Sequence, residues 1–216
     1  MNGNPVIILG AGGHAKVIAD ILRITNRKIL GFVTPDAKPQ MEFFGSVILG
    51  DDSFIEKYST DEINLVNGIG SLPDQDIRWV VAENLRNKGY RFQQVIHPNA
   101  VIARNVTLEE GIQIMAGVII QPDVKIGTDS IINTGVIIDH DCVISDNCHL
   151  APGVCCSGSV SVGKNVHIGT GANIIQGVNI GEKTVIAAGT TLYKDIPPGS
   201  LVKERKNLGI EDLGEE

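Results

Sequence analysis

Apolar residues follow two different spacings along the chain, and the change falls near residue 95. Up to that point, short apolar runs at 6–9, 29–33 and 63–69 predict buried strands. Apolar residues within 15–25 and 74–88 instead repeat at helical spacing. Strands that alternate with helices indicate a small parallel sheet. We therefore predict a small α/β Rossmann-like N-terminal domain over residues 1–94.

From Ile96 onward, an apolar residue recurs at every sixth position without an insertion or deletion. Seventeen consecutive positions, ending at Leu192, are Ile, Leu, Val or Cys. A second series of smaller residues follows four positions after the first, often with Gly, Asn or Asp between the two. A six-residue period is typical of a parallel β-helix, in which each repeat forms one flat side and a turn. We predict a left-handed parallel β-helix of hexapeptide repeats over 95–196, with three sides to a coil, and a C-terminal tail over 197–216.

The composition and net charge are those of a globular protein and argue against several classes of binding partner. A hydrophobic content of 43% supplies a core, and an aromatic content of only 4% means that branched aliphatic residues must fill it. The net charge of −7 argues against binding to nucleic acid or to an anionic membrane. Because the sequence has neither a long apolar run nor a signal-peptide layout, we expect a cytoplasmic protein without a membrane span. Cys142, Cys148 and Cys156 fall on inward positions, so we expect reduced core residues there.

One histidine has surroundings that suit proton transfer. His140 lies outside both inward series, between Asp139 and Asp141, and a neighbouring carboxylate can orient an imidazole and stabilise its protonated form. His149 follows half a coil later, so the two histidines should project from roughly opposite sides of the prism. A site that used both would have to lie between subunits. His167, one coil beyond His149, either lines the same groove or lies on a solvated face.

A glycine-rich turn follows the first predicted strand. The pattern Gly10-x-Gly12-x-x-Ala15 matches a loose dinucleotide-binding fingerprint, in which the glycines allow close approach and the helix N-terminus favours phosphate. The half-sized sheet, together with His14 inside the loop, fits a single nucleoside diphosphate better than a whole dinucleotide.

Three motifs together resemble a known family. The loop GAGGHAKV at 10–17, the sequence IHPNA at 96–100, and Asn133-Thr134-x5-His140-Asp141-x7-His149 resemble the hexapeptide-repeat sugar O- and N-acyltransferases. This family includes bacterial enzymes that acetylate UDP-4-amino sugars, perosamine N-acetyltransferases and a sialic acid O-acetyltransferase-like branch. The resemblance extends from residue 5 to about residue 200. It implies transfer of an acetyl group from acetyl-CoA to a nucleotide-linked amino sugar, and favours the 4-amino group of a UDP-4-amino-4,6-dideoxy sugar.

The resemblance also implies roles for particular residues. His140 would be the general base, and Asp141 would raise its basicity. The nucleotide-sugar site would comprise Gly12, Gly13, His14, Asp36, Gly70 and Asn133. Acetyl-CoA would contact His149, Gly158, Thr170 and Ala188. Because prisms of this architecture commonly associate side by side, we expect a homotrimer with active sites between subunits, and we expect no metal. The chain departs from the family pattern at 33–36, where paired acidic residues are common, and at 202–206, where a GxPAK ending is usual.

Three alternatives remain at this point. An imidazole base serves a hydroxyl as well as an amine, so the chain could be an O-acetyltransferase acting on sialic acid or another hydroxyl acceptor. A zinc enzyme like the γ-class carbonic anhydrases could use His140, His149 and His167 across a trimer interface. A non-catalytic scaffold or nucleotide-binding module is the third.

Overall fold

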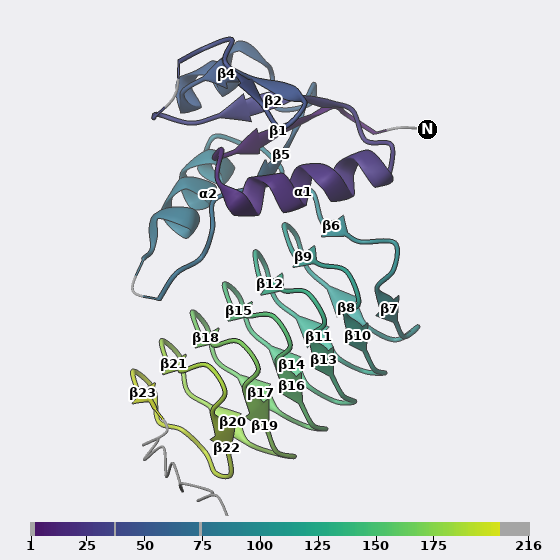
Figure 1. Ribbon diagram of the computed structural model, residues 1–216, viewed down its shortest axis with the longest axis vertical. Helices are drawn as coiled ribbons and strands as arrows, with labels where there is room; N and C mark the ends of the chain where they lie inside the picture. Colours follow the sequence, from purple (N-terminus) through teal and green to yellow (C-terminus); the bar gives the residue numbers. More distant parts are fainter. Residues whose placement is uncertain (1–2, 37, 74, 204–216) are drawn as a thin grey trace, which may run out of the picture.

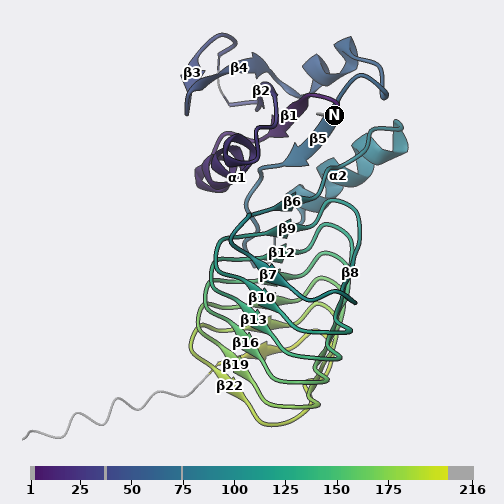
Figure 2. The same ribbon diagram turned by 90° about the vertical axis from the view of Figure 1, so that its right-hand side faces the viewer.

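The chain folds into two parts that stack end to end (Figure 1). The computed structural model describes residues 3–36, 38–73 and 75–203. A small α/β domain forms the upper part, and a three-sided prism of short parallel strands forms the lower part, as Figure 2 shows from the side. Both predicted architectures are therefore confirmed. Among the described residues, no helix is long and apolar enough to span a membrane.

The N-terminal domain is a five-stranded sheet, in the order β3-β4-β2-β1-β5, with helices packed on it. Strands β1, β2, β4 and β5 run parallel, whereas β3 is antiparallel to β4. The elements are β1 (Val6–Leu9), α1 (Gly13–Ile24), β2 (Ile29–Val33), β3 (Glu42–Phe43), β4 (Ser46–Gly50), the 3-10 helix η1 (Asp52–Lys57), β5 (Asn64–Asn67) and α2 (Ile77–Asn87). The spacing of apolar residues did not predict β3, β4 or η1, because these short segments lack a sustained period.

The strands of the β-helix form three parallel sheets, here called I, II and III. Sheet I contains β6 (Val95–Ile96), β9 (Gln113–Ile114), β12 (Ile131–Ile132), β15 (His149–Leu150), β18 (His167–Ile168), β21 (Val185–Ile186) and β23 (Leu201–Val202). Sheet II contains β7 (Val101–Ile102), β10 (Ile119–Ile120), β13 (Ile137–Ile138), β16 (Cys155–Cys156), β19 (Asn173–Ile174) and β22 (Thr191–Leu192). Sheet III contains β8 (Thr107–Leu108), β11 (Lys125–Ile126), β14 (Val143–Ile144), β17 (Ser161–Val162) and β20 (Asn179–Ile180).

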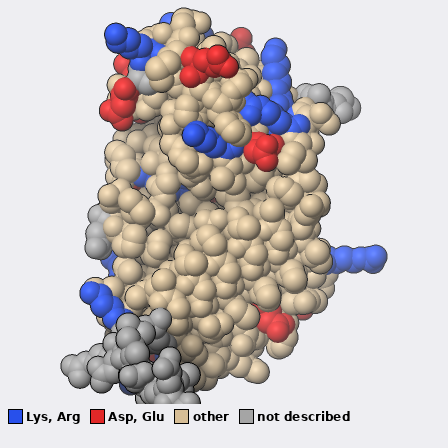
Figure 3. All heavy atoms as spheres, viewed as in Figure 1, with Lys and Arg blue, Asp and Glu red and all other residues tan. Residues whose placement is uncertain are grey.

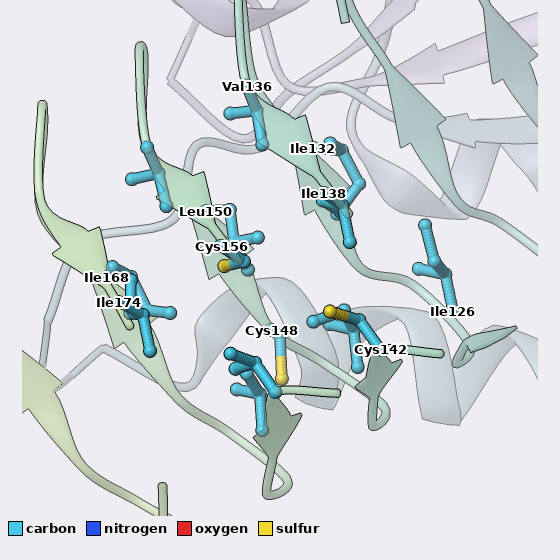
Figure 4. Close-up of a cluster of buried hydrophobic side chains, with 14 of the residues drawn as sticks. Ile126, Ile132, Val136, Ile138, Cys142, Cys148, Leu150, Cys156, Ile168 and Ile174 are labelled. Carbon is cyan, nitrogen blue, oxygen red and sulfur yellow. The ribbon is translucent and has the colours of Figure 1, made fainter. Parts of the chain in front are cut away.

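The inward columns form one continuous core. Residues of the six-residue series and of the smaller series bury their side chains inside the prism. Figure 4 shows Cys142, Cys148 and Cys156 among the inward Ile, Leu and Val side chains. These three thiols are at most 1% exposed, and burial raises the pKa of Cys148 to about 12. They are core residues, as the pattern predicts.

Most corners of the β-helix contain one residue with left-handed backbone. At the corners between sheets I and II, this residue is a glycine with φ between 66° and 71°. These glycines are Gly117, Gly135, Gly153, Gly171 and Gly189. At the II–III corners, Asp123, Asp141 and Ser159 take the same conformation. Asp and Asn tolerate it better than other residues with a Cβ, which explains the composition of the turns.

The N-terminal domain packs on the outer face of sheet I. The buried Ile131 of β12 and Met115 belong to the same apolar cluster as Ile18 and Ile21 of α1. Arg86 of α2 forms two hydrogen bonds with Asp129 at a III–I corner, of 2.6 and 2.8 Å. Apolar packing and a bidentate ion pair thus join the two parts of the chain.

Sheet II has an uncharged outer face. Its outward residues are Val101, Ile119, Ile137, Cys155, Asn173 and Thr191. Val101 is 64% exposed and Ile137 is 39% exposed. The I–II corner column is uncharged as well, and Figure 3 shows few Lys, Arg, Asp or Glu side chains on the β-helix in this view.

The last coil extends beyond the predicted boundary at residue 196. Leu201–Val202 pair in parallel with Val185–Ile186, so β23 adds a further rung to sheet I. The six-residue count misses this rung because the next inward residue after Leu192 is Ile196, only four positions later, after which the spacing of six resumes to Val202. Most of the predicted tail, residues 204–216, lies outside the described part of the chain.

Candidate active site

A cleft of about 700 Å³ opens at the carboxyl ends of the parallel strands β1, β2 and β5. It is lined by segments 10–14, 33–36 and 68–70, together with Met41, Phe43, Asp52, Ile77 and Val81. Ligands of open α/β sheets bind outside the carboxyl ends of the strands. The predicted residues Gly12, Gly13, His14, Asp36 and Gly70 therefore come together in one cavity.

Exposed backbone at two glycines lines part of this cleft. Gly12 caps α1 and Gly13 begins it, and no atom lies within 4 Å of the position that a Cβ would take at either residue. The first turn of α1 contains no acidic residue. Free N–H groups at the start of a helix, open space and the absence of negative charge suit a phosphate group.

His14 joins the cleft to the β-helix. Its Nε2 lies 2.6 Å from Oε1 of Gln113, a fully buried residue of β9. Burial is the main reason that the pKa of His14 falls to about 4, with a smaller contribution from the charge of Arg78. The imidazole is therefore neutral at physiological pH.

His140 lies at a II–III corner, with its side chain about half exposed. Its Nδ1 is 2.8 Å from Oδ2 of Asp141, so Nδ1 carries the proton and Nε2 is left as the basic nitrogen. The hydrogen bond with Asp141, together with the charges of Asp139 and Asp141, raises the pKa of His140 above its usual value. This arrangement suits a general base.

Gly158 lies one coil below His140 and packs against its ring. A Cβ at Gly158 would come within 2.6 Å of Cε1 and 2.7 Å of Nε2 of His140, so the position has no room for a side chain. The backbone N–H of Gly158 makes no hydrogen bond to a backbone acceptor in the part of the chain described. A base and a free N–H donor are thus side by side.

His149 has a different environment. Its Nδ1 is 3.2 Å from the carbonyl oxygen of Ser71, and its Nε2 is 3.2 Å from Nδ2 of Asn133. Nδ1–H therefore donates to Ser71, and Nε2 accepts from Asn133. Burial, followed by the charge of His167, lowers the pKa of His149 to about 3. The ring of His167 meets it edge-on at 4.8 Å between centroids.

Thr170 and Ala188 lie in one column at the I–II corners, where the Gly189 N–H donates to the Thr170 carbonyl over 2.8 Å. Asn133 lies at an earlier corner of the same column. Within one chain, His140 and Gly158 at the II–III corners are therefore separated from this column by the width of sheet II. The predicted residues thus fall into three places. His140 and Gly158 lie at one edge of sheet II, Asn133, Thr170 and Ala188 lie at its other edge, and the remaining nucleotide-sugar residues line the cleft.

The described residues contain no group of three or more His, Cys, Asp or Glu side chains that could hold a metal ion. His149 and His167 are adjacent on sheet I, whereas His140 projects from another corner. The three histidines do not converge within one chain.

Comparisons with known proteins agree with this geometry. Residues 5–85 match the family model described as PglD N-terminal domain, and residues 159–194 match the hexapeptide repeat of succinyl-transferase. A search of curated proteins found no match. The structure of PerB from Caulobacter crescentus, in complex with CoA and GDP-perosamine, is 37% identical over 92% of this chain and 93% of that chain, with a TM-score of 0.84. A variant of perosamine N-acetyltransferase from the same organism is likewise 37% identical over 92% of each chain, with a TM-score of 0.83. The chain belongs to the hexapeptide-repeat sugar N-acetyltransferases.

Two further solved structures have the same fold. The acetyltransferase domain of PglB from Neisseria gonorrhoeae FA1090, in complex with acetyl coenzyme A, is 27% identical over 92% of this chain and 95% of that chain, with a TM-score of 0.84. WeeI from Acinetobacter baumannii AYE is 25% identical over 91% and 95%, with a TM-score of 0.81. The predicted family is confirmed, and the chain is an acyltransferase.

Several residues of the site lie beyond what the motifs indicate. Asp52 and Phe43 reach the cleft from η1 and β3, two elements that the apolar spacing does not predict. Gln113 contacts His14, and Ser71 contacts His149, only because the N-terminal domain packs on sheet I. In the sequence these residues lie 99 and 78 positions from their histidine partners, so no local pattern links them.

Proposed function

We propose that the protein transfers an acetyl group from acetyl-CoA to the 4-amino group of a 4-amino-4,6-dideoxy sugar carried on a nucleoside diphosphate. One observation carries this proposal. A member of the sugar N-acetyltransferases contains both a cleft that suits a phosphate group and a His140 whose Nδ1 is held by Asp141. Relatives of the same fold hold CoA or acetyl-CoA, and one also holds GDP-perosamine. Acetyl-CoA acts here as a co-substrate.

The complete site is formed between subunits of a homotrimer. The uncharged outer face of sheet II, with exposed Val101 and Ile137, suits burial at a three-fold axis. Packing around such an axis brings the II–III corner of one subunit near the I–II corner of its neighbour, because these two corners flank sheet II. His140 of one subunit then faces the Asn133 corner and the nucleotide cleft of the next.

The I–II corner column is the path for the pantetheine arm. Its residues are small from Ala151 onward, and nothing lies within 4 Å of a Cβ built at Gly135, Gly153, Gly171 or Gly189. Thr170 and Ala188 would border the arm on one side, and Gly158 of the adjacent subunit on the other. His149 already has partners at both ring nitrogens, so we assign it to orienting Asn133 toward the acetyl group and the sugar.

The reaction proceeds by direct transfer. The sugar amine attacks the thioester carbonyl while Nε2 of His140 removes an amine proton, and the Gly158 N–H donates to the oxyanion, a contact worth about 3 kcal/mol. Collapse of the tetrahedral intermediate breaks the C–S bond, and the imidazolium returns the proton to the leaving thiolate. Asp141 holds Nδ1–H and so keeps the basic lone pair on Nε2. The products are the sugar amide and free CoA.

The test is release of CoA thiol with a panel of acceptors. UDP-4-amino-4,6-dideoxy sugars, GDP-perosamine and free sialic acid are offered separately with acetyl-CoA. The family resemblance favours UDP, and the complex of the 37%-identical relative favours GDP. Turnover with one nucleotide-linked amino sugar supports the proposal and assigns the nucleotide. Turnover with sialic acid alone would reassign the enzyme as an O-acetyltransferase.

Replacing Gly13 with Glu should weaken binding of the sugar nucleotide selectively. The added carboxylate would occupy the open space at the start of α1 and repel the diphosphate, so KM for the sugar nucleotide should rise roughly tenfold to a hundredfold. KM for acetyl-CoA should remain unchanged. Gly13→Ala is the matched control, because a methyl group alone has room there. Equal effects of both variants would contradict a phosphate site at this position.

Replacing Asp141 with Asn should shift the pH profile toward acid. Asp141 raises the pKa of His140, so in the wild type activity is lost as pH falls through that raised pKa. Without the carboxylate, the acid limb should move to lower pH. The rate on the plateau should fall roughly a hundredfold, because the amide no longer favours the Nδ1–H form. Measured kcat/KM against pH checks this, and an unchanged acid limb would rule out His140 as the titrating base.

A further inference from the structure

Gln113 lies at the contact between the two parts of the chain, and its side-chain orientation is determined. It is fully buried, and its Nε2 donates to the backbone carbonyl of Asn67 over 2.6 Å. A carbonyl can only accept, so the amide nitrogen must point toward Asn67. Asn67 in turn donates through its side chain to the Arg78 carbonyl over 2.8 Å.

This orientation determines the protonation state of His14. The Oε1 of Gln113 faces Nε2 of His14 at 2.6 Å, and an amide oxygen can only accept. Nε2 of His14 must therefore carry the hydrogen. In a neutral imidazole this leaves Nδ1 without one, as a hydrogen-bond acceptor.

The surroundings keep the ring neutral. The pKa of His14 is lowered to about 4, first by burial and then by Arg78 of α2. His149 of β15 is also close enough to interact electrostatically. The acidic groups on the cleft are Asp36 and Asp52, and neither contributes to the shift at His14.

The remaining nitrogen of His14 is available to a ligand. Nδ1 is accessible to solvent, and no described group forms a hydrogen bond with it. His14 lines the cleft beside Gly12, Gly13 and Gly70. A lone pair there attracts a hydroxyl or N–H hydrogen and repels phosphate oxygens.

We propose that Gln113, a residue of the β-helix, is a positioning residue for the nucleotide cleft. It holds His14 in the Nε2–H form, so that Nδ1 accepts a hydrogen bond from a hydroxyl or N–H group of the sugar nucleotide rather than contacting its phosphates. The identity of this ligand rests on the proposed function. The protonation state of His14 does not.

The first measurement is nitrogen NMR of the full-length protein labelled with ¹⁵N-histidine. Loss of one signal set in His14→Gln assigns the resonances. We expect a neutral Nε2–H imidazole that does not titrate between about pH 5 and 8, and a shift of Nδ1 when a nucleotide sugar is added. An Nδ1–H form, or titration near neutral pH, would overturn the proposal. This result is independent of turnover, so it is obtained even if the acyl acceptor proves to be a different molecule.

The second measurement uses Gln113→Glu. A carboxylate facing Nε2 favours the imidazolium, so Nδ1 changes from acceptor to donor. We expect KM for the sugar nucleotide to rise about tenfold near neutral pH and to recover as pH increases, with KM for acetyl-CoA unchanged. If the substitution only damaged the structure, KM for the sugar nucleotide would not recover as pH increases. Gln94→Glu places the same charge at the domain boundary outside the cleft, where Gln94 donates to Leu108 and Glu109, and should leave both KM values unaffected.

The two outcomes separate the parts of the proposal. If His14 becomes protonated in Gln113→Glu and KM does not change, Nδ1 does not contact the substrate and the proposal fails. If Gln113→Glu does not assemble, the wild-type NMR measurement still decides which nitrogen carries the proton.

Discussion

Replacing Gly158 with Ala should reduce turnover by roughly 10² to 10⁴-fold, about as much as removing the imidazole of His140. A methyl group at position 158 would come within 2.6 Å of the ring of His140. The backbone at Gly158 does not need left-handed angles, so alanine introduces no backbone strain there. The ring must therefore move while the coil remains folded. Steady-state kcat, together with sedimentation to verify assembly, measures the effect.

A double-mutant cycle distinguishes displacement of His140 from other damage. If Gly158→Ala acts by moving the base, it should cost little further activity in a His140→Ala background. A double variant that loses activity as the product of the two single effects would show that Gly158 contributes separately, for example through the oxyanion contact. Near-normal turnover of His140→Ala alone would contradict the assignment of His140 as the general base.

The β-helix and its internal register could be predicted because the information is local and repeated. Each inward Ile, Leu or Val occupies one position in six, and a slip by one residue would expose the whole column. The pairing of His140 with Gly158 follows from the same count, because residues one coil apart stack as Cys155 stacks on Ile137. The proximity of Asp141 to His140 is visible directly in the sequence.

Contacts that depend on domain docking could not be predicted in this way. His14 meets Gln113, and His149 meets Ser71, only after α1 and α2 have packed on sheet I. The two-residue strand β3 is too short for a period to appear, and the rung β23 follows a four-residue step from Leu192 to Ile196 that breaks the six-residue count. The resemblance assigned His149 to acetyl-CoA, whereas its two nitrogens are engaged by Ser71 and Asn133 within the chain.

At a sugar-nucleotide concentration well below the KM of Gly13→Glu, mixed trimers should be clearly more active than either parent variant. His140→Ala lacks the base, and Gly13→Glu binds the sugar nucleotide weakly. In a composite site, the intact cleft of one variant can meet His140 of the other. Random reassembly of equal amounts should therefore restore about one quarter of wild-type activity, because each site needs the right subunit at each of two positions. Thiol release before and after denaturation and refolding of the mixture measures the recovery.

The direction of this result separates two architectures. If the cleft and the base belonged to the same subunit, each chain would carry one defect, and the mixture would be no more active than its parents in any ratio. As a control, refolding each variant alone should give little activity at this substrate concentration, and refolding wild type with His140→Ala should give about half of wild-type activity. A double variant with both substitutions in the same chain, mixed equally with wild type, should instead give about one quarter of wild-type activity. A composite site needs an intact subunit at both of its positions. A value near one half for that last mixture would contradict a site between subunits.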